Sequence, residues 1–399
     1  MQCRSLSSEP VIIAGGSYLE SCKYPRWDRL FGSGIRASLA LQRLSPSSSL
    51  LTYAPALYRA DVEATLKSAG LGVQVTKSSH PCTFTWLHPF ELLYYPEEDR
   101  LPPLNAEAEA VLRFGMMEGS AVVHAKRAVY DPQNETEGFF ANGSEVSELV
   151  MILSELELFR QPGTTDIDHT QKIQARMSQA VANLVFQHRG HFDFFAILLK
   201  DKVGGVSVYV GDEPTPVPTY AAESFFRIGG GDVFAAAFAH AWMECGLDIF
   251  AAADCAARSL AWFVEGARLP LPLDSELPRR VCGPPPPRVR IVGTNTLEMG
   301  QLLVKTDDLL RQQSISVAFD LIDSVGDEAD ASLPTLILLG EDSNLAEIQH
   351  SAATTLAARR TVVYSPGRAI GLAAHYFPSA RISDDYASAL FHLLREPLP

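Results

Sequence analysis

The sequence predicts a mixed α/β protein of two domains, each built on a largely parallel sheet covered by helices. Three observations lead to this prediction: a length of 399 residues, apolar strand-like runs that alternate with segments of helical spacing, and one proline run that interrupts the pattern. A chain of this length exceeds one ordinary domain. Alternating strands and helices favour a parallel sheet covered on both faces, because parallel strands need crossover connections.

Composition narrows the class of partner. Hydrophobic residues make up 47% of the chain and charged residues 20%, which is typical of a globular protein. Lys and Arg number 33 against 47 Asp and Glu, a net charge of -14, which disfavours a nucleic acid polymer as partner. The chain has no run of 18 apolar residues, so no membrane partner is expected. The start, Met1–Pro10, lacks the apolar core of a signal peptide, which predicts a cytoplasmic protein.

The proline run marks the expected domain boundary. Four prolines follow Gly283, and such a run can neither continue a helix nor lie in a central strand. It favours a stiff, extended spacer. We therefore expect one domain over residues 1–275, a Pro-rich linker over 276–288 and a smaller Rossmann-like α/β domain over 289–399.

In the first domain, apolar runs predict strands and segments of helical spacing predict helices. The expected strands are Val11–Ala14, Leu51–Tyr53, Val73–Val75, Ala121–His124, Ala128–Tyr130, Phe194–Leu199 and Val206–Val210. The expected helices are Ile35–Leu44, Asp61–Ala69, Ile167–Gln187, Val233–Cys245 and Ala251–Ala261. Gly70 follows a helix as its expected stop, and Gly204-Gly205 indicates a hairpin turn.

The second domain repeats the alternation on a smaller scale. Strands are expected at Val289–Val292, Thr335–Leu339 and Thr361–Tyr364, and helices at Leu297–Gln312 and Asn344–Arg359. In open α/β sheets, ligands bind beyond the carboxyl ends of the strands. This rule directs attention to the residues after Gly293 and after Gly340.

A glycine run before an acidic residue is the clearest chemical motif. Gly229, Gly230 and Gly231 precede Asp232 and a helix of small residues. Glycines let successive backbone N–H groups converge on an anion, and the helix N-terminus adds its dipole. A carboxylate directly after such a loop can accept the proton of an attacking hydroxyl. The alternative is structural, since Asp is a good helix N-cap and glycines often turn a chain before a helix.

The surroundings of this motif resemble the ribokinase-like PfkB family of sugar and nucleoside kinases. The family's C-terminal signature reads Gly-Ala-Gly-Asp before a small-residue helix and then a second Ala-rich helix, as in Ile228–Ala267. Val11–Glu20 is similar to the family's opening strand, Gly32–Ala37 to its glycine-rich helix start, and Tyr130–Pro132 to its Asp-Pro element. The resemblance covers most of residues 10–268.

The resemblance implies a ribokinase-like fold with a small β lid, to which Phe84–Tyr95 would contribute, and it implies ATP with magnesium. It makes Asp232 the catalytic base and Gly229–Gly231 the anion hole. The acceptor would be bound by Glu20, Gly34 and Arg36. Glu157 would be the magnesium ligand, where Ser154 replaces the Asn of the family's Asn-x-x-Glu motif.

A second acidic motif lies in the C-terminal domain. Asp342, Asn344 and Glu347 follow an expected strand, where a carboxylate could act at the anomeric carbon of a sugar. The alternative is a capping box formed by Asn344 and Glu347. Arg288–Thr294 and Asp342–Tyr364 resemble the nucleoside 2-deoxyribosyltransferase family. That resemblance implies Glu347 as nucleophile and Asp342 as the residue that orients the substrate, with Asn344 in place of a family glycine.

Three functions follow as hypotheses. The first is ATP-dependent phosphoryl transfer to a hydroxyl of a sugar or nucleoside, with or without glycosidic chemistry in the second domain. The second is an N-glycosidase or deoxyribosyltransferase whose kinase-like domain is degenerate. The third is a non-catalytic nucleotide-sensing or assembly subunit. In all three the partner is a small sugar, nucleoside or nucleotide, and the sequence leaves a homodimer open.

Overall fold

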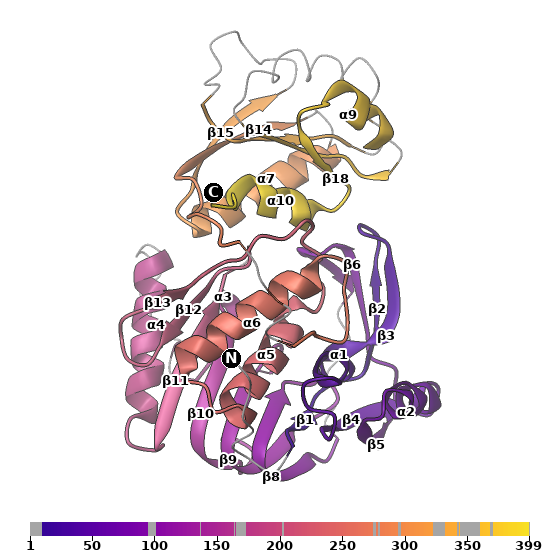
Figure 1. Ribbon diagram of the computed structural model, residues 1–399, viewed down its shortest axis with the longest axis vertical. Coiled ribbons are helices and arrows are strands. Elements are labelled where there is room, and N and C mark those ends of the chain that lie inside the picture. Colours follow the sequence, from indigo (N-terminus) through magenta and orange to yellow (C-terminus); the bar gives the residue numbers. More distant parts are fainter. Residues whose placement is uncertain are drawn as a thin grey trace.

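The computed structural model describes residues 10–94, 101–135, 137–162, 164, 173–201, 203–273, 277, 280–293, 297–321, 332–340, 343, 360–367 and 370–398. Within these ranges the protein is a mixed α/β structure with three sheets, which confirms the predicted fold class. The largest sheet lies in the lower part of Figure 1, and the C-terminal sheet lies above it.

Nine strands form the large sheet in the order β13-β12-β11-β10-β9-β8-β1-β4-β5. Neighbouring strands from β5 to β11 pair in parallel, and β12 and β13 extend the β11 edge antiparallel, as the expected hairpin at Gly204-Gly205 requires. The bounds are β1 Ile12–Ala14, β4 Ser49–Pro55, β5 Gly72–Ser78, β8 Leu104–Phe114, β9 Ala121–Asp131, β10 Glu145–Ser154, β11 Phe194–Lys200, β12 Val206–Tyr209 and β13 Thr215–Val217.

Helices cover both faces of this sheet, because its central strands are apolar on both sides. In β10, Val150 and Ile152 belong to one buried cluster, whereas Leu149 and Met151 belong to another. Successive side chains of a strand point to opposite faces, so two helix layers are needed. One layer holds α1 Gly32–Leu41, α2 Arg59–Ser68, α5 Gly230–Ala239 with a π-helical turn at His240–Glu244, and α6 Ile249–Val264; the other holds α3 Glu155–Arg160 and α4 Ile173–His188.

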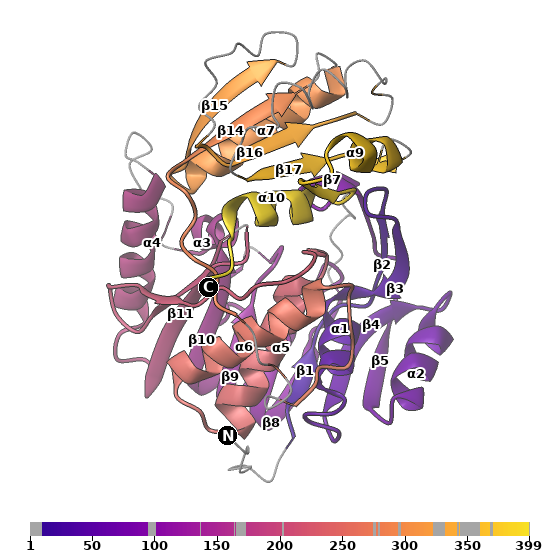
Figure 2. The same ribbon diagram turned by 45° about the horizontal axis from the view of Figure 1, so that its top comes forward.

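A small four-stranded sheet in the order β3-β2-β6-β7 stands beside the large one. Its bounds are β2 Tyr18–Cys22, β3 Trp27–Phe31, β6 Thr83–His88 and β7 Glu91–Tyr94. In both views β2 and β3 extend from the large sheet towards the C-terminal unit (Figures 1 and 2). The β element expected over 84–95 is therefore present as β6 and β7, up to Tyr94.

The C-terminal unit is a five-stranded parallel sheet in the order β15-β14-β16-β17-β18. Its strands are β14 Arg288–Gly293, β15 Ser316–Leu321, β16 Thr335–Leu338, β17 Thr361–Tyr364 and β18 Arg381–Ser383. Its helices are α7 Leu297–Gln312, α9 Ile370–Tyr376 and α10 Tyr386–Leu394. The helix expected over Asn344–Arg359 lies outside the described residues. None of the helices in the described ranges has both the length and the apolar character that crossing a membrane requires.

Helix α10 joins the C-terminal unit to the large one. In Figure 2 it lies between the C-terminal sheet and the large unit. The backbone N–H of Phe225 donates to the hydroxyl of Ser388 at 2.7 Å, and the ring of Phe225 stacks on that of Phe391 at 4.6 Å between centroids. Arg395, just after the helix, pairs with Asp201 at 3.0 Å. The contacts of Phe225 fix α10 against the segment that leads to the glycine loop, and the ion pair joins the end of α10 to the turn after β11.

A buried histidine of α10, His392, makes the stability of the protein sensitive to acid. Burial, together with the Arg381 guanidinium, lowers the pKa of His392 from 6.5 to about 4. The unfolded chain therefore binds more protons between these values, so the stability contributed by neutral His392 is complete above pH 6.5 and is lost as the pH falls towards 4. From pH ~7.5 to ~5, we expect the parent to lose about 2 kcal/mol more unfolding free energy than His392→Gln. Urea titrations at both pH values measure this difference, and equal losses in the two proteins would contradict it.

Candidate active site

The glycine loop forms the entry to α5. Gly229 is the N-cap residue and has a φ of 77°, which glycine adopts without strain. A Cβ at Gly229 would lie 2.0 Å from Nε of Arg36, so the available space also requires glycine. Gly231 lines a cavity, whereas a Cβ at Gly230 would face Leu260 of α6 at 3.0 Å. The first helical turn leaves backbone N–H groups without intrahelical partners, so this loop can bind an anion.

Asp232 lies in the first turn of α5 and is only 8% exposed. Its Oδ2 accepts a hydrogen bond from Nη1 of Arg36 at 2.6 Å, and its Oδ1 accepts one from Nε2 of Gln133 at 2.8 Å. Burial raises the pKa of Asp232 above its ordinary value, and the charge of Arg36 opposes that rise. The side chain is thus an oriented carboxyl group whose proton affinity exceeds that of a solvent-exposed aspartate.

Arg36 joins Asp232 to the small sheet. Its guanidinium is 2% exposed and pairs with Glu20 as well as with Asp232. Glu20 also accepts hydrogen bonds from the backbone N–H of Gly32 and from the indole of Trp27, each at 3.1 Å. The strand expected at Val11–Ala14 is present as β1, and Glu20, which the resemblance grouped with the opening strand, lies on β2. Two expected acceptor-binding residues and the expected base therefore form one buried network.

The residues of this network line a cavity of about 270 Å³. It opens between the small sheet, the glycine loop and the carboxyl ends of β9 and β11, as the rule for open α/β sheets predicts. Its wall is rich in charge of both signs. The charged residues that line it are Glu20, Arg36, Asp131, Glu157, Lys200, Arg227 and Asp232.

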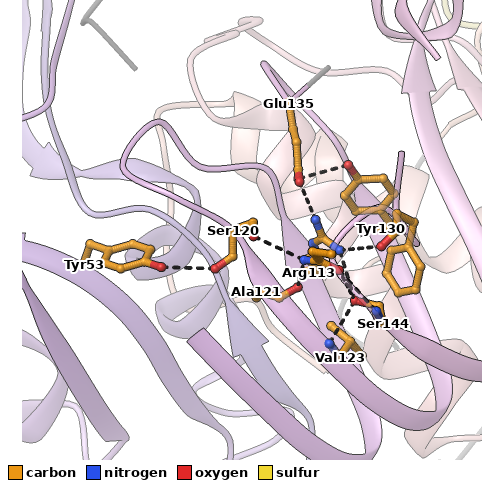
Figure 3. A network of polar contacts seen from close by, with 10 residues as sticks. Tyr53, Arg113, Ser120, Ala121, Val123, Tyr130, Glu135 and Ser144 are labelled. Atoms are coloured by element: carbon orange, nitrogen blue, oxygen red, sulfur yellow. Dashed lines mark hydrogen bonds and ion pairs between the residues drawn. The ribbon is translucent and has the colours of Figure 1, made fainter. Parts of the chain in front are cut away.

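A buried arginine supports the loop that brings Asp131 and Gln133 to the cavity. Arg113 of β8 is fully buried, pairs with Glu135 and donates to the carbonyl of Phe139 at 3.0 Å (Figure 3). The hydroxyl of Tyr130 also donates to Glu135, at 3.0 Å. Because Glu135 is held from two sides, the backbone between β9 and Glu135 has a fixed course past the cavity.

Lys200, at the end of β11, lies beside two carboxylates. Its Nζ is 2.7 Å from Oδ2 of Asp131 and 3.9 Å from Oε2 of Glu157. Glu157 also accepts the backbone N–H of Ser154 in a capping box at the start of α3. Ser154 thus has a structural role here, in place of the Asn that the resemblance would have placed beside a metal.

Magnesium does not fit these residues. The ion needs near-octahedral oxygen ligands at about 2.1 Å. Asp131 and Glu157 line the cavity beside Lys200, but the ammonium of Lys200 occupies Oδ2 of Asp131, and Glu157 accepts the backbone N–H of Ser154. In the described ranges, no group of three acidic, His or Cys side chains is arranged to hold a metal.

Gly34 does not line the cavity. A Cβ at Gly34 would lie 2.6 Å from the carbonyl oxygen of Gly15, so this glycine allows α1 to approach the chain directly after β1. Its neighbour Ser33 lines the cavity in its place. The glycine pattern thus reflects helix packing, and the residue that lines the cavity is one position earlier, at Ser33.

Sequence reasoning missed Gln133, Lys200 and Arg227 as lining residues. Lys200 ends an apolar strand, and a cation at the carboxyl end of a buried strand was the signal that could have identified it. Gln133 directly follows the Asp131-Pro132 element, and this position was the signal that could have identified it. The C-terminal candidates Asp342, Asn344 and Glu347 lie outside the described residues, so their placement stays a prediction.

Comparison with known proteins gives similarity of structure only. No family model matches the sequence, and no curated protein matches it. A fructokinase double mutant from Vibrio cholerae O395, in a fructose, ADP and potassium ion bound form, is 15% identical with a TM-score of 0.48 over 66% of this chain and 95% of that chain. Phosphofructokinase-2 from Escherichia coli is 11% identical with a TM-score of 0.47 over 67% and 97%. A pyrophosphate-dependent kinase of the ribokinase family, complexed with a pyrophosphate analog and myo-inositol, is 14% identical with a TM-score of 0.44 over 67% and 100%.

Proposed function

We propose that the protein transfers a phosphoryl group from ATP to a hydroxyl of a small sugar, polyol or nucleoside. One observation carries the proposal: Asp232 directly follows the glycine loop, and both face the cavity that Glu20 also lines. Phosphoryl transfer needs an anion-binding loop, a base and a site for a hydroxyl within one space. These three parts converge here from segments far apart in the sequence.

The transfer step follows from the contacts of Asp232. An acceptor hydroxyl replaces Gln133 at Oδ1, while Arg36 keeps its hold on Oδ2 and orients the carboxylate. As the hydroxyl oxygen attacks the terminal phosphorus of ATP, its proton passes to Oδ1, the bond from phosphorus to the bridging oxygen breaks, and ADP leaves. Backbone N–H groups at Gly229 and Gly231, which line the cavity, stabilise the charge on the transferred group, whereas the N–H of Gly230 donates to the carbonyl of Arg227 at 3.0 Å.

The cavity walls favour a polyhydroxylated acceptor. Glu20, Gln133 and Asn134 supply oxygen and amide groups, and Tyr18 and Trp86 supply aromatic surface. Sugars present hydroxyl edges and apolar C–H faces, so this mixture suits them. A volume of about 270 Å³ restricts the acceptor to a small molecule.

The test is a search for product. The purified protein is incubated with ATP and pools of sugars, polyols and nucleosides, and mass spectrometry detects any acceptor that gains a phosphoryl group. We expect at least one phosphorylated product with matching ADP formation. If every pool remains unphosphorylated while the protein is folded, the proposal fails.

A non-catalytic ligand-binding subunit is the second candidate, and one observation favours it. Both oxygens of Asp232 are already engaged, by Arg36 and by Gln133. If Gln133 stays in place, the cavity can bind a ligand that Asp232 never deprotonates. A rise in melting temperature with an acceptor or ATP, without turnover, would support this candidate.

A further inference from the structure

Lys200 and the glycine loop face the same space. The Nζ atom of Lys200 lies 3.5 Å from the point that a Cβ on Gly231 would occupy, and it is the nearest described atom outside the neighbouring residues and backbone of α5. Lys200 and Gly231 both line the cavity. An anion held by the backbone N–H groups of the loop would therefore have this ammonium as a close neighbour.

The same ammonium pairs with Asp131, the nearer of the two carboxylates beside it. Asp131 is 1% exposed, with Oδ2 on Lys200 and with Oδ1 lacking a hydrogen-bond partner among the described residues. Burial disfavours the charge of Lys200, but Asp131 and Glu157 outweigh it and raise the pKa of Lys200 to about 12. The lysine is thus a permanent cation, fixed in place by Asp131.

A divalent ion cannot share this position. Bound to Asp131 it would lie within a few ångströms of the Lys200 ammonium, and like charges so close repel strongly in a buried site. A divalent ion and Lys200 would therefore compete for Oδ2 of Asp131, which the ammonium contacts at 2.7 Å. Resting on the phosphoryl transfer proposed above, we infer that Lys200 is the built-in cation of this site, which binds the phosphate of its ligand without a protein-bound divalent metal.

The first experiment uses the metal alone. Mn²⁺ is titrated into the full-length protein, and electron paramagnetic resonance measures the free ion. We expect no Asp131-dependent site in the parent and one new site per chain in Lys200→Ala, where Asp131 has lost its ammonium partner; adding Asp131→Asn should remove it. Lys67→Ala, at an exposed lysine of α2, is the matched control and should gain none. An Asp131-dependent Mn²⁺ site in the parent would overturn the inference.

The second experiment uses inorganic phosphate in excess chelator. Phosphate should raise the melting temperature of the parent, and its affinity should fall about tenfold or more in Lys200→Ala, as expected for a lost charge-assisted hydrogen bond. Mn²⁺ should restore binding to that variant. If phosphate binds neither protein without metal, or binds both equally, the inference is wrong. Neither measurement needs turnover, so a failure of the metal-free phosphate site can be told apart from a failure to find a phosphorylated product. If Lys200→Ala does not fold, Mn²⁺ binding and metal-free phosphate binding by the parent still test the inference.

Discussion

Asp232→Asn is expected to lower the rate of phosphoryl transfer by roughly 10²–10⁴-fold, the usual contribution of a positioned general base. The amide keeps the shape of the side chain but cannot accept the proton of the acceptor hydroxyl. Arg36 stays paired with Glu20 in this variant, so the buried guanidinium does not lose its last counter-charge. We therefore expect a folded protein with a large loss in kcat and a small change in KM for the acceptor.

The measurement is steady-state ADP formation with whichever acceptor the product search identifies. Asp61→Asn is the matched control, because Asp61 is an exposed residue in the first turn of α2. The control should retain the parent rate. Turnover by Asp232→Asn at the parent rate would remove Asp232 as the base.

Local sequence patterns predicted much of the fold. The glycines before an apolar helix predicted the turn at Gly229, and the apolar run before Lys200 predicted β11. The strand β9 was expected as two pieces, Ala121–His124 and Ala128–Tyr130, separated by Ala125–Arg127. The structure has one strand, Ala121–Asp131, whose middle residues are half-buried or exposed. Backbone pairing with β8 and β10 continues through that polar stretch, and a local pattern cannot reveal such pairing.

The candidate site could be predicted as a set of residues but not as a set of contacts. Arg36 and Asp232 are 196 positions apart in the chain, and their ion pair depends on how α1 and α5 pack. The sequence pattern places Lys200 directly after the expected strand Phe194–Leu199, and Asp131 in an Asp-Pro element. Parallel strand order brings the carboxyl ends of β9 and β11 to one edge of the sheet, on either side of β10. This order places Lys200 against Asp131.

Arg36→Met is expected to lower the free energy of unfolding by about 3–5 kcal/mol, the usual cost of removing one partner from a buried ion pair. Methionine fills much of the space of arginine but leaves the carboxylates of Glu20 and Asp232 buried without their shared cation. Urea titration at neutral pH measures the loss, and Arg59→Met, which breaks an exposed pair on α2, should change stability little.

The double variant Arg36→Met/Glu20→Gln separates charge from packing. If the loss comes from two uncompensated carboxylates, neutralising Glu20 should restore part of the stability. If it comes from lost packing around the guanidinium, the second substitution should add its own cost. An Arg36→Met protein as stable as the parent would mean that Arg36 does not compensate these charges. The ion pairs of Arg36 with Glu20 and Asp232 would then no longer explain why Asp232 keeps a fixed orientation beside the glycine loop.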